Sequence, residues 1–353
     1  MTKHDPGSLR ADLAALWPDY RPTPLLELPT LAAQTGVGRI LAKIEGERPL
    51  GNFKSLGGTI AGLRALASAS GVGSIAQLLS RRGLPDRLPR LLCASDGNHG
   101  LSVAAAARRA GSAATVFLPE SVDPARIARI QALGGEVRLV VGTYDQAVLE
   151  ARAAAARGEG LLIPDTTQNV TDPVVADVMD GYSVMTSELV EQFRAIGTRP
   201  THAFVQAGVG GLAAAVAQGL ADQPMQLVVV EPASAPCVAR ALECGKPILI
   251  EGGLETVADM LSCGLASAPA LNILLRHRAA STLVDEIALH AATTTLRQMG
   301  VPTTPSGAAG FAGLVQVAAN DDLRRSHGLG ASSVVLLIIS EGAAAAANAT
   351  ENS

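Results

Sequence analysis

The sequence predicts an α/β fold with a mostly parallel sheet, and three observations lead to that prediction. Short apolar segments alternate with Ala- and Leu-rich segments of helical length, and glycine or asparagine lies in the turns between them. The apolar segments 227–230 and 334–339 are continuous, as expected for strands buried on both faces of a sheet. Glycine is abundant at 36 residues and aromatic residues make up only 3% of the 353-residue chain, which suits close packing of helices on a sheet.

The clearest strand–turn–helix unit lies near residue 90. Residues 90–94 form an apolar strand, residues 95–100 a polar turn, and residues 101–110 an Ala-rich helix. The same pattern recurs along the chain. It predicts further strands at 40–44, 114–118, 136–141, 203–206, 227–231 and 333–339, and further helices at 54–67, 124–133, 144–157, 210–219 and 285–299.

The length of the chain favours two lobes over one compact unit. The segment 68–89, rich in Gly and Ser, resembles a surface connection, and the segment 166–173 is a second polar interruption. We therefore predict a small lobe formed by residues 67–181, and a large lobe formed by residues 1–66 and 182–353.

Charge and composition exclude several classes of partner. The formal net charge of −4 gives no basic surface, so neither nucleic acid nor an anionic membrane surface is expected as a partner. No apolar segment is long enough to cross a bilayer. Residues 1–10 lack the apolar core of a secretory signal, which predicts a cytosolic protein. Cys93, Cys237, Cys244 and Cys263 lack the paired spacing of a zinc or redox site, so we expect no metal site.

The first segment that carries chemistry is centred on Lys54, a lone lysine among small residues at the start of a predicted helix. A lysine is costly to bury in such surroundings unless it is neutralised or bonded. A Schiff base to a carbonyl compound would do both. A solvated lysine at a helix start is the alternative, and the lysine alone does not decide between them.

The second segment contains Ser95, Asp96, Asn98 and His99, between a predicted strand and a predicted helix. Hydroxyl and backbone N–H groups at a helix N-terminus favour an anion such as a substrate carboxylate. An ordinary helix cap, formed by Asp96 or Asn98 with His99 merely packed, explains this segment alone equally well.

The third segment is a glycine-rich loop after the strand 203–206, and it consists of Gly208, Val209, Gly210, Gly211 and Leu212. Its glycines let the backbone wrap around a phosphate, and the following helix adds positive potential. A dinucleotide-binding loop is the alternative. Glu231 lies at a suitable distance for that alternative, but the loop comes late in the chain and Ala213 is only the permitted variant at the sixth position.

Taken in order, the three segments resemble the pyridoxal-phosphate (PLP) enzymes of fold type II, the threonine dehydratase and cysteine synthase group, over residues 23–342. The resemblance implies two α/β lobes with the cofactor in the cleft between them. Within that class the chain is most similar to the diaminopropionate ammonia-lyase family. The matching strings are Phe53-Lys54-Ser55-Leu56-Gly57-Gly58, Asp96-Gly97-Asn98-His99-Gly100, Asp165-Thr166, Gly181-Tyr182, Gln206-Ala207-Gly208-Val209-Gly210, Val230-Glu231-Pro232, Gly264-Leu265-Ala266, Ser306-Gly307-Ala308 and Ser340-Glu341-Gly342.

The resemblance also implies how the cofactor is held. Lys54 would carry pyridoxal 5'-phosphate as a Schiff base, and Asn98 would contact its phenolic oxygen. The backbone of residues 208–212 would bind the phosphate. Ser340 would hydrogen-bond the pyridine nitrogen, and a hydroxyl there favours elimination over transamination.

For the substrate, the resemblance implies that Ser95 and nearby amides bind the carboxylate, with Asp96, His99 and Asp165 as further substrate-binding residues. The acid at Asp96 is the most specific match, because this family uses an acid there to remove a Cα proton from the face opposite the lysine. Pro305, Thr167 and Ala343 depart from the family pattern near the expected pocket.

The implied reaction is α,β-elimination on a small amino acid, converting 2,3-diaminopropionate to pyruvate and ammonia. A serine or threonine dehydratase, or a β-replacement enzyme of a biosynthetic pathway, is the alternative within enzymes. A non-catalytic PLP-binding protein and a Rossmann dehydrogenase are the alternatives from other classes. Family analogy implies a homodimer.

Overall fold

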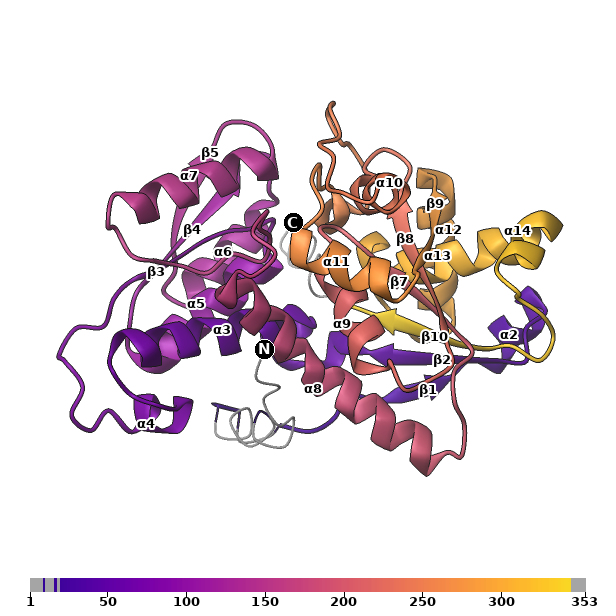
Figure 1. The fold of residues 1–353 in the computed structure, drawn as a ribbon, viewed down its shortest axis with the longest axis horizontal. Coiled ribbons are helices and arrows are strands. Elements are labelled where there is room, and N and C mark those ends of the chain that lie inside the picture. Colours follow the sequence, from indigo (N-terminus) through magenta and orange to yellow (C-terminus); the bar gives the residue numbers. More distant parts are fainter. Residues whose placement is uncertain (1–8, 10–15, 18–19, 344–353) are drawn as a thin grey trace, which may run out of the picture.

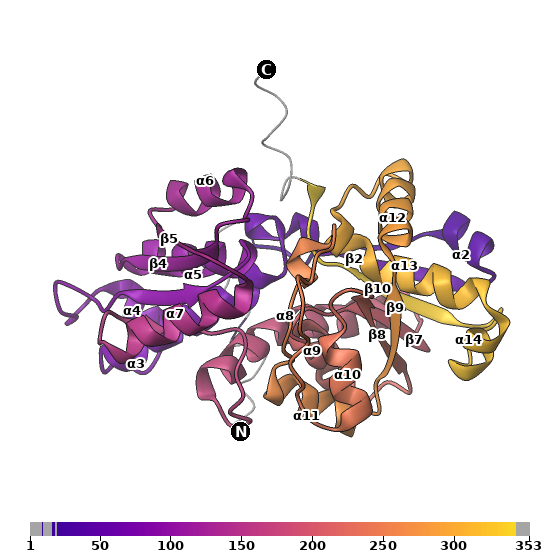
Figure 2. The ribbon, with the colours of Figure 1, turned by 90° about the horizontal axis from the view of Figure 1, so that it is seen from above.

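The computed structural model describes residues 9, 16–17 and 20–343, and it has the predicted α/β architecture. Most of residues 1–10, from which the cytosolic location was predicted, lie outside the described residues. Two separate sheets lie side by side, each flanked by helices (Figure 1). Seen from above, the bodies of the two sheets again lie side by side (Figure 2), and the glycine loop, Asn98 and Ser340 line one common pocket.

The larger sheet has six strands in the order β1-β2-β10-β7-β8-β9. Strand β1 pairs antiparallel to β2, and all the other pairs are parallel. The strands are β1 (Leu25–Glu27), β2 (Arg39–Ile44), β7 (His202–Gln206), β8 (Gln226–Pro232), β9 (Ala280–Val284) and β10 (Val334–Ile339).

Strand β10, in the middle of this sheet, is apolar throughout because both of its faces are buried. In β10, Val335, Leu337 and Ile339 belong to one core cluster, whereas Leu336 and Ile338 belong to the other. Helices α2 (Pro29–Thr35), α12 (Glu286–Gln298) and α13 (Pro305–Ala319) contribute to the first cluster. Helices α8 (Pro173–Ala195), α9 (Gly211–Gly219), α10 (Cys237–Cys244) and α11 (Ala268–Arg276) contribute to the second.

The smaller sheet is fully parallel, with four strands in the order β5-β4-β3-β6. Its strands are β3 (Leu91–Ala94), β4 (Ala114–Pro119), β5 (Glu136–Val140) and β6 (Leu161–Leu162), and its connecting helices are α5 (Asn98–Ala110), α6 (Pro124–Ala132) and α7 (Tyr144–Ala156). The chain runs outward from β3 to β5 and then returns to β6. Right-handed connections therefore place α7 on the opposite face from α5 and α6.

Helices α3 (Lys54–Ala69) and α8 connect the two bodies. Helix α3 packs against both α5 and α8, and α8 packs in turn against α9 (Figure 1). Asp172 caps α8 by accepting hydrogen bonds from the amides of Val174 and Val175. The assignment of residues 1–66 and 182–353 to one lobe and 67–181 to the other stays a prediction.

All the predicted strands and helices are present, with ends shifted by a few residues. The segment 68–89 is not only a connection, because it contains α4 (Ile75–Ser80), capped by Ser74. The remaining elements are the short helices η1 (Glu45–Glu47), η2 (Pro49–Gly51) and η3 (Asp259–Leu261), and α14 (Asp321–Ser326). No helix in the described part of the chain is long and apolar enough to span a membrane.

Candidate active site

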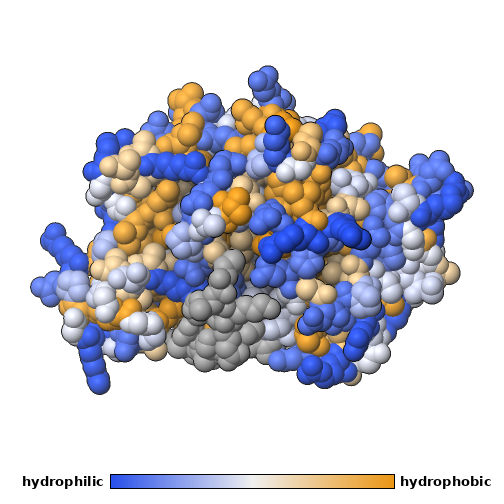
Figure 3. Space-filling view, viewed as in Figure 1, coloured by the Kyte–Doolittle hydropathy of each residue, from blue (hydrophilic) through white to orange (hydrophobic). Residues whose placement is uncertain are grey.

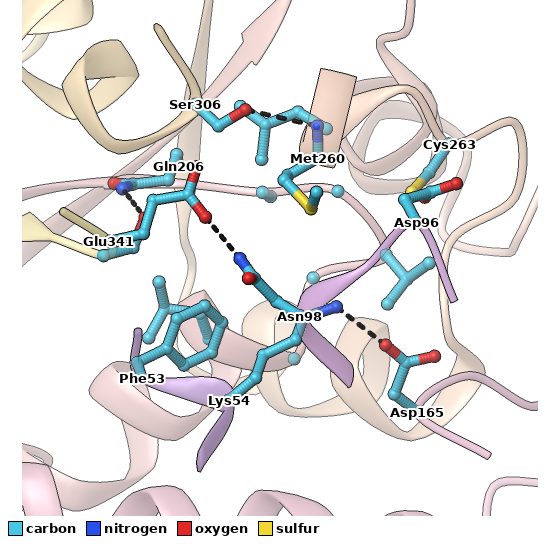
Figure 4. A pocket seen from close by; sticks show the side chains of 18 of the residues that line it. Phe53, Lys54, Asp96, Asn98, Asp165, Gln206, Met260, Cys263, Ser306 and Glu341 are labelled. Atoms are coloured by element: carbon cyan, nitrogen blue, oxygen red, sulfur yellow. Dashed lines mark hydrogen bonds and ion pairs between the residues drawn. The ribbon is translucent and has the colours of Figure 1, made fainter. Parts of the chain in front are cut away.

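The pocket lies where the carboxyl ends of parallel strands from both sheets converge, the usual ligand position in open α/β folds. About 730 Å³ of space free of protein atoms lies among its lining residues, and part of that space is open to solvent. The loop after β3, the loop after β7 and the end of β10 all contribute to its wall (Figure 4). Of the sequence-predicted residues, those that line it are Lys54, Asp96, Asn98, Asp165, Gly208, Val209, Gly210, Gly211, Leu212 and Ser340.

Lys54 is the first residue of α3, and its side chain is 22% exposed. Its Nζ lies 2.8 Å from Oδ2 of Asp165, which follows β6 (Figure 4). The hydroxyl of Tyr144, at the start of α7, donates a 2.5 Å hydrogen bond to the other oxygen of Asp165. The sequence analysis did not identify Tyr144, because its link to the site depends on a contact between two separate elements.

Charge pairing sets the protonation of Lys54 and Asp165. Burial alone would lower the pKa of Lys54, but the negative charge of Asp165 outweighs burial and raises that pKa. Burial alone would raise the pKa of Asp165, but Lys54, together with His99, lowers it. The pair is therefore an ammonium and a carboxylate in this structure.

In the loop after β3, the residue that binds the amides at the helix start is not one of the residues that line the pocket. The hydroxyl of Ser95 accepts hydrogen bonds from the amides of Gly97 and Gly100, both at 2.8 Å, so Ser95 ties the loop to the helix start. Neither Asp96 nor Asn98 caps α5, so the helix-cap interpretation of those two residues is wrong. The Ser95 hydroxyl accepts both of these bonds, so neither bond uses its own hydrogen.

His99 lies behind the pocket. It is fully buried, its Nε2 is 2.8 Å from the carbonyl oxygen of Ile163, and its Nδ1 has no hydrogen-bond partner. Burial lowers its pKa, which favours the neutral imidazole. His99 and Ser95 are thus the two sequence-predicted residues that do not line the pocket.

Asp96 lies in the pocket wall near Cys263 (Figure 4). Burial raises the pKa of its carboxyl group to about 7, against the opposing charge of Lys54. A carboxyl group that titrates near neutral pH can serve as a general base.

The glycine loop continues directly into α9. Gly210 has φ +97°, a left-handed conformation that favours glycine. A Cβ placed on Gly211 would lie 3.8 Å from Cε2 of Tyr182, an ordinary van der Waals contact, so there is room beside this part of the backbone. The first amides of a helix carry positive potential, and here they border a roomy pocket.

The hydroxyl of Ser340 is held at the opposite wall. Gln206 donates from Nε2 to Ser340 Oγ at 2.8 Å and to the carbonyl oxygen of Ile338 at 3.0 Å. The carbonyl oxygen can only accept, which identifies the Gln206 atom as the amide nitrogen. Ser340 therefore accepts this bond and keeps its own hydrogen for a group in the pocket.

These residues fit pyridoxal phosphate in three ways. Lys54 supplies a buried amine for a carbonyl group. The start of α9 supplies a backbone cradle for a phosphate, with open space at Gly211. Ser340 and Asn98 supply a hydroxyl and an amide for the ring. Within the described residues, no cluster of three or more His, Cys, Asp or Glu could hold a metal ion.

Comparisons with known proteins agree with this fit. The "Diaminopropionate ammonia-lyase" of Escherichia coli K12 is 33% identical over 253 residues, which cover 69% of this chain and 63% of that relative. The match thus spans less than two thirds of the relative's length. The human "Serine dehydratase-like" protein is 30% identical over 280 residues, covering 78% of this chain and 76% of the relative.

A solved structure of Escherichia coli diaminopropionate ammonia-lyase in complex with D-serine superposes with a TM-score of 0.84 at 28% identity, covering 97% of this chain and 90% of that one. The fold is therefore the type II fold that the sequence predicts. The family pattern described as "Pyridoxal-phosphate dependent enzyme" matches residues 16–341. The chain belongs to the family of pyridoxal-phosphate dependent enzymes.

Proposed function

We propose that this protein is an ammonia-lyase that converts 2,3-diaminopropionate to pyruvate and ammonia, with PLP bound at Lys54. The observation that carries the proposal is the presence of two candidate bases, Lys54 and Asp96, in one pocket that also contains Asp165. In Figure 4 the side chains of Lys54 and Asp96 enter the pocket from different sides. The similarity to ammonia-lyases over most of the chain supports the same reaction.

The cofactor, when bound, supplies an electron sink for the negative charge that develops at the substrate Cα. The amides of residues 208–212 would hold its phosphate, Asn98 would contact its phenolic oxygen, and the Ser340 hydroxyl would donate to its ring nitrogen. A hydroxyl donor leaves that nitrogen without a full positive charge, which favours elimination. Lys54 and Asp96 each remove the Cα proton of one substrate enantiomer.

Asp165 gives the site its preference for a diamino acid. With the cofactor held at this site, the carboxylate of Asp165 could receive the second amino group of the substrate, in competition with its ion pair to Lys54. Tyr144 keeps this carboxylate oriented. The overall reaction consumes water and releases pyruvate with two molecules of ammonia.

A serine or threonine dehydratase is the second candidate, supported by the 30% identity to the human serine dehydratase-like protein. A β-replacement enzyme and a non-catalytic PLP-binding protein are weaker candidates, because neither accounts for Asp96 in the pocket. Family membership gives no support to the Rossmann dehydrogenase alternative.

A panel of amino acids, assayed for keto acid and ammonia, tests the proposal. Both enantiomers of 2,3-diaminopropionate, serine and threonine are compared, with Lys54→Ala as the control for background. We expect two ammonia molecules per pyruvate from diaminopropionate, at the highest kcat/KM of the panel. Turnover of serine or threonine without diaminopropionate would identify a dehydratase, and no turnover at all would leave a binding protein.

A homodimer and a cytosolic location are parts of the same proposal, and both rest on sequence and family analogy. On the face shown in Figure 3, hydrophobic residues form separate groups among hydrophilic ones, so this face does not single out an interface. The mass of the purified protein in solution, measured by light scattering, tests the dimer.

A further inference from the structure

Glu341 is a buried carboxylate in the wall of the pocket, directly after Ser340, and it is 2% exposed. One of its oxygens accepts a hydrogen bond from Nδ2 of Asn98, and the other accepts from the hydroxyl of Thr304 (Figure 4 shows the first). The hydroxyl of Thr303 also donates to its main-chain oxygen at 2.5 Å. The residue that caps the start of α13 thus helps to hold the Glu341 carboxylate in place.

The Asn98–Glu341 bond joins two parts of the molecule that fold around different sheets. Asn98 begins α5 after the four-stranded sheet, and Glu341 follows the last strand of the six-stranded sheet. Burying a carboxylate is costly unless hydrogen bonds compensate. Burial raises the pKa of Glu341, while the bonds from Thr304 and Asn98 and the charge of Arg126 oppose that rise. Neither sheet needs this bond for its own strand pairing.

The bond determines which way the Asn98 amide points. A carboxylate can only accept, so the amide nitrogen and not the amide oxygen faces Glu341. The nitrogen carries two hydrogens, and Glu341 takes one of them. The second remains available to an oxygen of a ligand in the pocket, which Asn98 also lines.

We propose that Glu341 is a positioning residue for the cofactor: it orients the Asn98 amide so that an N–H group, and not the amide oxygen, is presented to the phenolic oxygen of PLP. The proposal rests on the proposed role of Asn98 at that oxygen. Without Glu341 the amide can rotate and present its own oxygen, which would repel the phenolic oxygen.

Cofactor binding to the apoprotein tests this role without any measurement of turnover. Glu341→Leu removes the acceptor at similar side-chain volume, and Glu341→Gln keeps an acceptor oxygen for Asn98. The dissociation constant of PLP and the visible absorption maximum are measured by titration, and circular dichroism checks that each variant is folded. We expect Glu341→Leu to weaken PLP binding about tenfold, comparable to one hydrogen bond to a charged group, and to shift the absorption maximum. Glu341→Gln should keep most of the wild-type PLP affinity and an absorption maximum close to that of the wild type.

A double-mutant cycle with Asn98→Ala separates positioning from general support of the fold. If Glu341 acts through Asn98, Glu341→Leu should add almost no further loss of PLP affinity in the Asn98→Ala background. Full additivity of the two losses, or unaltered affinity and spectrum in Glu341→Leu, would overturn the proposal. Failure of the wild-type protein to bind PLP at Lys54 would instead refute the proposed function.

Asp259→Asn provides a matched control. Asp259 of η3 forms an ion pair with Arg126 of α6, with 2.7 Å between the guanidinium nitrogen and the carboxylate oxygen. This ion pair is a second link between the two bodies, and it does not involve Asn98. Because this variant leaves the amide of Asn98 oriented, its absorption maximum should equal that of the wild type. The same shift in Asp259→Asn as in Glu341→Leu would mean that Glu341 only holds the two bodies together, contrary to the proposal.

Discussion

Among single residues, Ser95 and Asp96 have separate roles, one in holding the start of α5 and one in the pocket. The sequence alone does not separate these roles. Ser95 holds the start of α5 through two backbone amides, and Asp96 is left free of capping. Helix capping therefore does not explain why this residue is an acid. Its place in the pocket wall, with a pKa of about 7 caused by burial, is therefore best explained by chemistry.

Replacing Asp96 by Asn tests this chemistry. Asn has nearly the same size but cannot remove a proton, so turnover of the D-amino acid should fall about 10²–10⁴-fold, the usual contribution of a general base. The L-amino acid, which depends on Lys54, should keep at least part of its rate. Steady-state kinetics with both enantiomers measure the difference. Equal and near-wild-type rates for both would refute the role of Asp96.

The pKa of Asp96 predicts a pH dependence with a definite sign. Below about pH 7 the carboxyl group is protonated and cannot act as a base, and above it the carboxylate is available. The kcat/KM for the D-amino acid should therefore rise with pH through a midpoint near 7. A flat profile between about pH 5.5 and 8.5 would mean that another group takes the proton.

At the scale of elements, the glycine loop and α9 form a phosphate cradle whose two central glycines differ. A side chain at Gly210 would be strained, because its φ is +97° and Val238 lies 3.3 Å from the expected Cβ. A Cβ at Gly211 would make only an ordinary van der Waals contact, at 3.8 Å from Cε2 of Tyr182. Gly211 thus allows the ligand contact to be tested separately from the fold.

Gly211→Ala should weaken PLP binding while the free energy of unfolding of the apoprotein stays the same or rises slightly, since Ala favours a helix more than Gly. The added methyl group would occupy space that the phosphate needs. PLP titration and urea unfolding of the apoprotein measure the two effects. Gly210→Val serves as the comparison, because it should lower both the PLP affinity and the free energy of unfolding. Unaltered PLP affinity in Gly211→Ala would place the phosphate elsewhere.

The elements that the sequence predicts are those with a long apolar strand or a regular helical pattern. Strands β1 and β6, of three and two residues, are too short for any periodicity to be visible. Helix α8 was missed although Asp172 and Pro173 mark its start, because it packs against both α3 and α9 and leaves only a narrow polar face at Asp180, Ser187 and Glu191. Local pattern cannot anticipate burial on several sides.

In the candidate site too, local motifs were predictable from the sequence and contacts between distant residues were not. Lys54, Asp96 and the glycine loop were predictable because each lies in a compact motif. The contacts that complete the site join residues far apart in the chain, such as Asn98 with Glu341 and Tyr144 with Asp165. The sequence contains these residues but does not indicate which of them meet. Pro305, which departs from the family pattern, begins α13 next to the Thr304 cap.

At the scale of the whole molecule, the pocket is lined from both bodies, so a ligand there connects them. Asn98 belongs to the body of the four-stranded sheet, whereas the glycine loop and Ser340 belong to the body of the six-stranded sheet. A ligand that binds only the folded form stabilises it by mass action.

Adding PLP should therefore raise the thermal unfolding midpoint of the apoprotein. At a ligand concentration of about 100 times Kd, the gain in unfolding free energy is about 2.7 kcal/mol. Pyridoxal, which lacks the phosphate, should raise the midpoint much less because the cradle at α9 stays empty. Calorimetry of the apoprotein with each compound measures this. Equal shifts with both compounds would argue against the phosphate cradle.

The covalent attachment site tests the central claim most directly. Protein loaded with PLP is treated with borohydride, which makes the link to the lysine permanent, and the labelled peptide is identified by mass spectrometry. We expect a single major label on Lys54, lost in Lys54→Ala. A label on another lysine, such as Lys43 or Lys246, or no label above background, would contradict it.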